Sequence, residues 1–237
     1  MVVVALIGAG ARAADYFLVT GNKKWSETEW VRLGDSTQTK TAPAAGNTYW
    51  VLGGYKDAGS GLTGGGNVDS STTAMQGVLC LGAPVDSDFG LQYGNLRAQY
   101  QIWKPNANVV NWYNGAIQLI NDWNTWSGVF NVCDGGSGST HEMQWQANVH
   151  APFAANFASE SDGVTIAIKA NKNQVCTIDS LTAGVPYLSM AGDNSGYKGS
   201  FTVADPYYPF VIAGTHSLGD PSVPNVAALV LPDNGAV

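Results

Sequence analysis

Six residues near the start of the chain have the spacing of a phosphate-binding turn. Gly8-Ala9-Gly10-Ala11-Arg12-Ala13 fits the pattern G-x-G-x-x-A and follows the apolar run Val2 to Ile7. In dinucleotide-binding enzymes such glycines let the backbone turn tightly around a pyrophosphate held at the N-terminus of a helix. Asp35 falls near the position of an acid that binds the ribose. The pattern therefore suggests the hypothesis of an oxidoreductase, which the rest of the chain has to support.

Glu142 is the best candidate for a catalytic acid or base, because it lies on the polar face of an alternating segment. Glycosidases place two carboxylates across a cleft and stack the sugar on aromatic rings. Trp145 is three residues further along an extended strand, so it lies on the opposite face from Glu142. The available partners, Glu160, Asp162 and Asp134, lie on no comparable strand. The sequence therefore assigns no catalytic residue, and we expect a protein that is not an enzyme.

The histidines are the only other candidates for a metal or a nucleophile-activating site, and they are His141, His150 and His216. His150 shares a face with Glu142, but eight residues of extended strand separate them by about 26 Å, too far to ligate one metal. No G-x-S-x-G nucleophile motif occurs. We predict no metal site, and no cofactor.

Aromatic residues form the most informative cluster of candidate binding residues. They crowd into a segment rich in asparagine and are Trp103, Trp112, Tyr113, Trp123 and Trp126. Aromatic rings with asparagine are typical of a glycan-binding face, but tryptophan and tyrosine also dominate contacts between proteins and fill hydrophobic cores. The sequence leaves three roles open for these five residues, which are the hydrophobic core, a subunit interface and a glycan-binding site.

The elements that position these residues are predicted to be strands. Alternation of apolar and polar residues recurs along the chain, whereas helical periodicity is scarce. The clearest strands are Arg97 to Ile102, Glu142 to His150 and Gly163 to Lys169. Turn-forming residues separate a dozen or so short strands, which favours an all-β fold. We predict an antiparallel β-sandwich or a jelly-roll-like barrel with long loops rich in Gly, Ser and Asn.

This fold prediction removes the support for dinucleotide binding, because a Rossmann domain needs helices that alternate with its strands. Gly8 to Ala13 is then predicted to be a small-residue turn after an N-terminal strand. No repeat of fixed period is visible, which argues against a solenoid. We expect one β domain over residues 1–237, with residues 1–40 as an extension or arm and Gly53 to Thr73 as an exposed excursion.

Composition narrows the function further. Charged residues make up 12% of the 237 residues, about half the usual share. The net charge is −7 without a basic cluster, which argues against direct nucleic-acid binding. No apolar run approaches the roughly 20 residues of a membrane-spanning helix, so no membrane span is expected. Three widely spaced cysteines fit neither a disulfide framework nor a metal knuckle.

The sequence favours a structural subunit of an extracellular assembly, first of all a virion capsid, cement or decoration protein. Its expected partners are copies of itself, as a homo-oligomer, and other subunits of the assembly. The expected localisation is the virion or the extracellular space. The alternative is a carbohydrate-binding lectin or glycosidase on a β-sandwich, with a glycan as its ligand.

Overall fold

The structure is a computed structural model that describes residues 13–71, 73, 75–84, 98–102, 109–119, 129–145, 152–153, 156–159, 165–170, 188–190, 194, 197, 200–203, 210–212 and 228–230. Over these residues the chain forms strands and no helix. The strands are β1 (Asp15–Leu18), β2 (Lys23–Lys24), β3 (Trp30–Arg32), β4 (Lys40–Thr41), β5 (Thr48–Val51), β6 (Asn67–Asp69), β7 (Val78–Leu81), β8 (Gln99–Ile102), β9 (Val109–Trp112), β10 (Gly115–Leu119), β11 (Val129–Val132), β12 (His141–Trp145), β13 (Pro152–Phe153), β14 (Asn156–Ser159), β15 (Thr165–Ala170), β16 (Leu188–Met190), β17 (Ser200–Val203), β18 (Phe210–Ile212) and β19 (Ala228–Val230).

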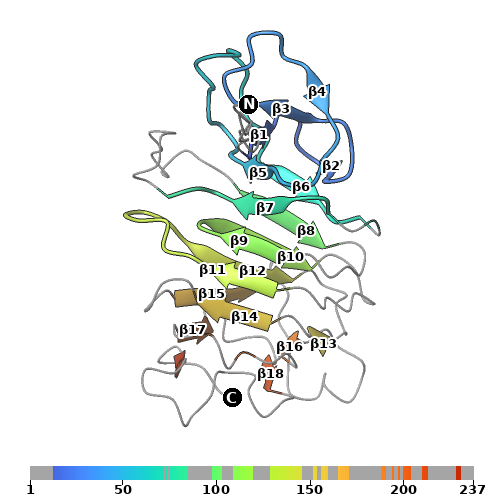
Figure 1. Ribbon diagram of the computed structural model, residues 1–237. Helices are drawn as coiled ribbons and strands as arrows, with labels where there is room; N and C mark the ends of the chain where they lie inside the picture. The colour runs from blue at the N-terminus through green and yellow to red at the C-terminus, as the bar shows by residue number, and fades with distance from the viewer. Residues whose placement is uncertain are drawn as a thin grey trace, which may run out of the picture.

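The strands stack in coils along one axis (Figure 1). From β5 to β12 the chain alternates between two sheets. Sheet A has the order β14-β11-β9-β7-β5-β1-β3-β4, and sheet B has the order β19-β17-β15-β12-β10-β8-β6-β2. A third sheet, β13-β16-β18, joins them at the C-terminal end. Because each strand of sheet A from β5 to β11 pairs in parallel with the strand one coil earlier, the chain winds as a parallel β-solenoid.

The predicted antiparallel sandwich or jelly-roll-like barrel is therefore wrong, and so is the argument against a solenoid. Among the named strands, only the pairs β1–β3 and β3–β4 are antiparallel. Alternation of apolar and polar residues has the same period in both kinds of sheet, so it does not reveal strand direction. The coils are also unequal, since the sheet A strands begin at Thr48, Val78, Val109, Val129 and Asn156. Unequal coils leave no fixed period in the sequence.

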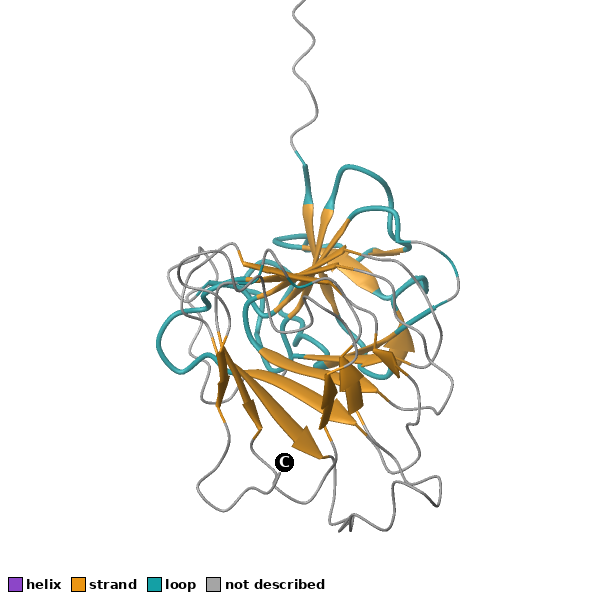
Figure 2. Cartoon of the chain, turned by 90° about the horizontal axis from the view of Figure 1, so that it is seen from below, coloured by secondary structure: helices purple, strands orange, loops and turns teal. Residues whose placement is uncertain are grey.

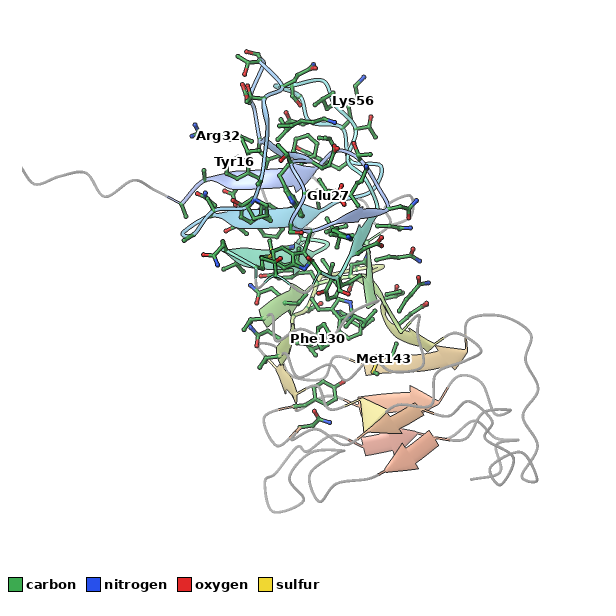
Figure 3. All side chains as sticks on the ribbon, turned by 90° about the vertical axis from the view of Figure 1, so that its right-hand side faces the viewer. Tyr16, Glu27, Arg32, Lys56, Phe130 and Met143 are labelled. Atoms are coloured by element: carbon green, nitrogen blue, oxygen red, sulfur yellow. The ribbon has the colours of Figure 1, made fainter. Side chains whose placement is uncertain are left out.

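The core lies between sheets A and B, whose strands superpose into walls when the molecule is viewed along the stack (Figure 2). Inward side chains of successive coils contact one another in columns. The columns of sheet A are Tyr49, Leu79, Val110, Phe130 and Val51, Leu81, Trp112, Val132; that of sheet B is Val68, Tyr100, Ile117, Met143. Each of these side chains is at most 1% exposed. Figure 3 shows Phe130 of sheet A and Met143 of sheet B at a similar level of the stack.

A tight corner at Asn114 and Gly115 turns the chain from β9 in sheet A to β10 in sheet B. Gly115 has φ +95°, and a Cβ atom there would overlap the carbonyl oxygen of Ala98 on the preceding coil. The Asn114 Oδ1 atom accepts a hydrogen bond of 2.8 Å from the Thr140 backbone N–H on the following coil. The corner therefore joins three coils and tolerates only glycine at its second position.

The N-terminal end of the solenoid is closed by a change of strand direction. Strand β3 turns back antiparallel beside β1, and β4 turns again antiparallel beside β3, so β4 forms the edge of sheet A. Lys40 lies on this edge, and Lys23 and Lys24 form β2 at the edge of sheet B. Lysines on an edge strand discourage pairing with another chain. The segment 1–40, expected as an extension or arm, contributes β1 to β3 and the first residue of β4.

Residues 54–64 form a hairpin that covers part of the outer face of sheet A. Its two arms are joined by backbone hydrogen bonds from Gly54 N to Gly64 O and from Asp57 N to Leu62 O, both 3.0 Å. The Tyr55 ring meets the Phe17 ring edge-on with centroids 6.1 Å apart. Phe17 is fully buried as a result. The first half of the expected excursion is therefore a hairpin that packs on the sheet through Tyr55 and Asp57, while residues such as Gly54, Lys56 and Thr63 are exposed.

Candidate functional site

A hollow of about 340 Å³ opens near the N-terminal end of the solenoid, and we call it the N-terminal hollow. It is lined by Ala13, Ala14, Asp15, Arg32, Leu33, Tyr55 and Asp57. Strand β1 supplies Asp15, strand β3 supplies Arg32 and the hairpin supplies Tyr55 and Asp57. Figure 3 shows Arg32 at this end of the stack. Its volume lies at the lower end of the range for small-molecule sites.

Asp57 holds the hairpin against the turn that follows β3. Its carboxylate accepts hydrogen bonds from the backbone N–H groups of Ser60 at 2.7 Å and Gly34 at 3.2 Å. Burial by itself raises the pKa of Asp57, but the hydrogen bonds from Ser60, Gly34 and Gly59 outweigh it and hold the pKa below its usual value. Asp57 is therefore an ionised structural anchor for the hollow, and its hydrogen-bonding capacity is largely used.

Asp15 and Arg32 are oppositely charged residues among those that line the hollow, but their side chains lie on opposite faces of sheet A. The Asp15 Oδ1 atom accepts a hydrogen bond of 2.9 Å from the Trp50 indole N–H. Within the part of the chain that the structure describes, no hydrogen bond or ion pair holds the Arg32 guanidinium; the ion pairs there join Lys23 to Glu27 and Lys40 to Glu29. The two charges are therefore separated by the sheet, because the Asp15 side chain lies on the outer face beside Trp50 and the Arg32 side chain lies on the face of Tyr16.

Tyr55 adds a hydroxyl group to the same hollow. Burial raises the pKa of the Tyr55 phenol above its usual value, and the negative charge of Asp57 raises it further. At neutral pH the phenol is therefore protonated, and its O–H is a hydrogen-bond donor as well as an acceptor.

Two aromatic rings continue the outer face of sheet A beyond the hollow. The rings of Trp50 and Tyr113 lie 6.1 Å apart, tilted by 35°, and both side chains are half-buried. On the coils further on, the Asn131 amide donates a hydrogen bond of 2.9 Å to the Asn111 amide oxygen. The surface therefore combines aromatic rings with amides that point away from the core.

The five aromatics singled out from the sequence separate into different environments. Trp112 is fully buried, and its indole N–H donates a hydrogen bond of 3.2 Å to Gly115 O. Its ring packs against Phe130 at 6.2 Å, so Trp112 is a core residue. Tyr113, the next residue, lies beside Trp50 as described above. Trp103, Trp123 and Trp126 lie outside the residues whose side chains are described.

The acids considered for catalysis or for ribose binding lie apart. Glu142 is half-buried on the outer face of sheet B, in register with Ala116 and Ala167. Asp35 accepts hydrogen bonds from the Thr37 backbone N–H and hydroxyl in an exposed turn. Over the described ranges, no three His, Cys, Asp or Glu side chains gather as a metal-ligand set, and no helix is long and apolar enough to cross a membrane.

His141 is buried beside Trp112 at the start of β12. Its Nε2 atom lies 2.8 Å from the Trp112 carbonyl oxygen, to which it donates, and the two rings are 5.0 Å apart. Burial lowers the pKa of His141 below its usual value of 6.5, and the backbone groups of Trp112 and Cys133 and the Asp134 charge oppose this only in part. His141 is therefore neutral at pH 7.

We expect the free energy of unfolding to fall as the pH is lowered from about 6.5, the value for an unfolded histidine. A histidine whose pKa is lower in the folded state binds its proton more readily in the unfolded chain. The contribution of His141 to the free energy of unfolding is therefore complete above pH 6.5. It is lost as the pH falls through the pKa of His141 in the folded state. Urea titrations between pH 7.5 and 5, with an NMR titration of the His141 ring, measure both quantities.

The pH range of these urea titrations ends at 5 because carboxylates titrate below that pH. Glu29, Asp35 and Asp57 have lowered pKa values and keep their charges through this window. Unfolding free energy that stays level or rises between pH 7 and 5, or a His141 pKa at or above 6.5, would contradict the buried neutral state.

Sequence reasoning missed the residues that line the hollow. They come from three separate segments, and Asp15 and Arg32 both lie in the part of the chain expected to be an arm. Trp50, which bonds to Asp15 but does not line the hollow, could have been placed on the outer face from the sequence. Thr48 to Val51 alternates, so that Trp50 lies on the face opposite Tyr49 and Val51. Nothing local marks Arg32 or Tyr55 as neighbours of Asp15.

Comparison with protein-family models, with curated proteins and with solved structures gives no match for this chain. The function is therefore argued from the fold and the surfaces described above.

Proposed function

We propose that this chain is a structural subunit of an extracellular assembly, such as a virion, in which copies of the chain contact one another through the outer face of sheet A. Its low share of charged residues, 12%, and its abundance of glycine, 29 residues, support this function. The β-solenoid supports it too, because stacked coils give an extended and rigid surface for contact.

The observation that carries this proposal is a stripe of exposed valines on sheet A. Val78 is 41% exposed and Val109 is 50% exposed, and they are the large apolar residues that stand out as exposed in the described part. The register places Val78 opposite Val109 and Val109 opposite Val129, which is half-buried. Three successive coils therefore present valine methyl groups in one line across the outer face.

An aligned apolar stripe differs from single exposed residues, which are common on any surface. Contiguous exposed apolar groups are typical of contacts between proteins. A second copy of the chain can bury the same stripe against itself, since a two-fold interface uses one surface patch twice. We name this surface, Val78, Val109 and Val129, the valine stripe.

The double substitution Val78→Lys with Val109→Lys is expected to weaken self-association at least about tenfold, because two ammonium groups would lose water at the contact. Analytical ultracentrifugation over a range of concentrations measures the effect. The wild-type chain should sediment as a multiple of 24.8 kDa, and the variant should shift towards the monomer at the same concentration.

Gln99→Lys is the matched control, because Gln99 lies on the outer face of sheet B and is half-buried. This variant adds a charge but should associate like the wild type. A wild-type chain that remains a monomer of 24.8 kDa at every concentration contradicts the proposal. Equal association of the double variant and the wild type places the contact elsewhere.

A further inference from the structure

We infer that Asn114 and Gly115 form a latent site of succinimide formation, which Thr140 on the following coil keeps unreactive until the stack opens there. The chain contains two Asn-Gly pairs, Asn114-Gly115 and Asn234-Gly235, and the first is the corner between β9 and β10. An asparagine followed by glycine can lose its side-chain amide as ammonia by reacting with its own backbone. This inference does not depend on the assembly proposed above, because the corner lies within one copy of the chain.

The reaction needs only these two residues and water. The Gly115 nitrogen loses its proton to water and bonds to the Asn114 Cγ atom. The bond from Cγ to Nδ2 breaks, and Nδ2 leaves with a proton from water as ammonia. The succinimide ring then takes up one water molecule. Opening at one carbonyl gives aspartate at position 114, and opening at the other gives isoaspartate, in which the main chain runs through Cβ and Cγ.

Thr140 holds both of the reacting groups. The Gly115 N–H donates a hydrogen bond of 2.6 Å to the Thr140 carbonyl oxygen, and the Asn114 Oδ1 atom accepts one of 2.8 Å from the Thr140 N–H. The first bond retains the proton that the nitrogen has to lose, and the second holds the asparagine side chain against the following coil. Because both bonds go to one residue, a single displacement of Thr140 releases the nitrogen and the amide together.

The rest of the corner is also restrained. The Gly115 carbonyl oxygen accepts a hydrogen bond of 3.2 Å from the Trp112 indole N–H, so both peptide groups of Gly115 are held. The Asn114 N–H donates to Leu81 O on the preceding coil at 3.1 Å, and Asn114 is 5% exposed. Ring closure requires rotation about bonds of Asn114, which these contacts oppose. The site is therefore closed in the stacked molecule and available in the unfolded chain.

Isoaspartate would make an opening of the stack permanent. Gly115 is in register with His141, so Thr140 moves away only when the start of β12 separates from β10. Isoaspartate adds one methylene group to the main chain at this corner, where even a Cβ atom on Gly115 would overlap the Ala98 carbonyl oxygen. A corner that has reacted in this way does not close again in the same geometry.

Peptide mapping of the full-length chain by mass spectrometry tests the site. Folded protein and protein in urea are incubated in the same mildly alkaline buffer, and isoaspartyl methyltransferase labels the isoaspartate product. We expect Asn114 to react at least about a hundredfold more slowly in the folded protein, because only the fraction of molecules that is open at the corner reacts. In urea, Asn234 should react at a rate similar to that of Asn114 and is the internal reference for the chemistry.

Two tryptophan variants test whether the opening is local to the corner. Trp112→Phe keeps an aromatic ring in the core but removes the hydrogen bond to Gly115 O, so reaction at Asn114 in the folded protein should become about tenfold faster. Trp30→Phe is the matched control. Trp30 is also fully buried and donates its indole N–H to a backbone carbonyl, that of Trp25, at 2.9 Å. It lies on β3, separated from β9 by three strands, so its replacement should change the rate by less than about twofold.

Three outcomes overturn the inference. The first is reaction of Asn114 as fast in the folded protein as in urea. The second is an Asn114 that does not react in urea while Asn234 does. The third is equal acceleration by Trp112→Phe and Trp30→Phe, which would mean that the reaction follows unfolding of the whole chain rather than displacement of Thr140.

Discussion

Replacement of Gly115 by alanine is expected to lower the free energy of unfolding by about 3 kcal/mol. The residue has φ +95°, which a side chain disfavours, and the added Cβ would overlap the backbone carbonyl of Ala98. Relief requires the corner to move away from the preceding coil. That movement would also disturb the hydrogen bond from Gly115 N to Thr140 O, 2.6 Å, on the following coil. Urea unfolding followed by circular dichroism measures the loss.

Gly46→Ala is the matched control for this prediction. Gly46 has a similar φ of +80°, but no atom lies within 4 Å of the position that its Cβ would occupy. Only the backbone penalty of about 1 kcal/mol is expected there. If both variants lost the same free energy of unfolding, the close approach of Gly115 to the Ala98 carbonyl would contribute nothing. The packing of the coils at Gly115 would then differ from that described.

Replacement of Trp112 by alanine is expected to cost about 4 kcal/mol of unfolding free energy, the usual range for a buried tryptophan. The indole fills the space between Phe130 and His141 and donates a hydrogen bond to Gly115 O. Its removal leaves a cavity and also removes the hydrogen bond to Gly115 O. Loss of near-ultraviolet circular dichroism and a lower urea midpoint would report the effect.

Tyr113→Ala is the control one residue further along the chain. Its side chain is half-buried on the outer face and packs against Trp50, so we expect a loss of about 1 kcal/mol. Equal losses for Trp112→Ala and Tyr113→Ala would contradict the separation of the two rings between the core and the outer face.

Particular residues show how much of the fold the sequence predicts. In Gln99 to Ile102 and in His141 to Trp145, alternation correctly separates buried Tyr100 and Met143 from half-buried Gln99 and Glu142. The same alternation applied to Val109 to Trp112 places Val110 and Trp112 on one face and Asn111 and Tyr113 on the other. Local patterns thus identify strands and their faces. They do not identify partners, because parallel and antiparallel neighbours impose the same local period.

The candidate site was less predictable than the strands. Asp15, Leu33 and Tyr55 line one hollow only because β3 turns back beside β1 and the hairpin folds over the outer face. Those contacts join segments separated by corners of unequal length, for which the chain gives no local signal. Asp57 lies in a run of Gly, Ala and Ser that indicates a turn, but its role as an anchor depends on Gly34, more than twenty residues earlier.

The stacking of coils also determines how the molecule comes apart. In the part of sheets A and B described here, each strand is hydrogen-bonded only to the strands beside it in the stack. The array is therefore one-dimensional, and its stability is close to a sum of nearest-neighbour terms rather than the property of one shared interior. Weakening an inner coil divides the array into two blocks that unfold separately. Weakening the last coil only lets that end of the array unfold locally. A substitution acts chiefly through its position in the series, so Gly115, whose corner joins three coils, lies where a single defect would uncouple the two ends.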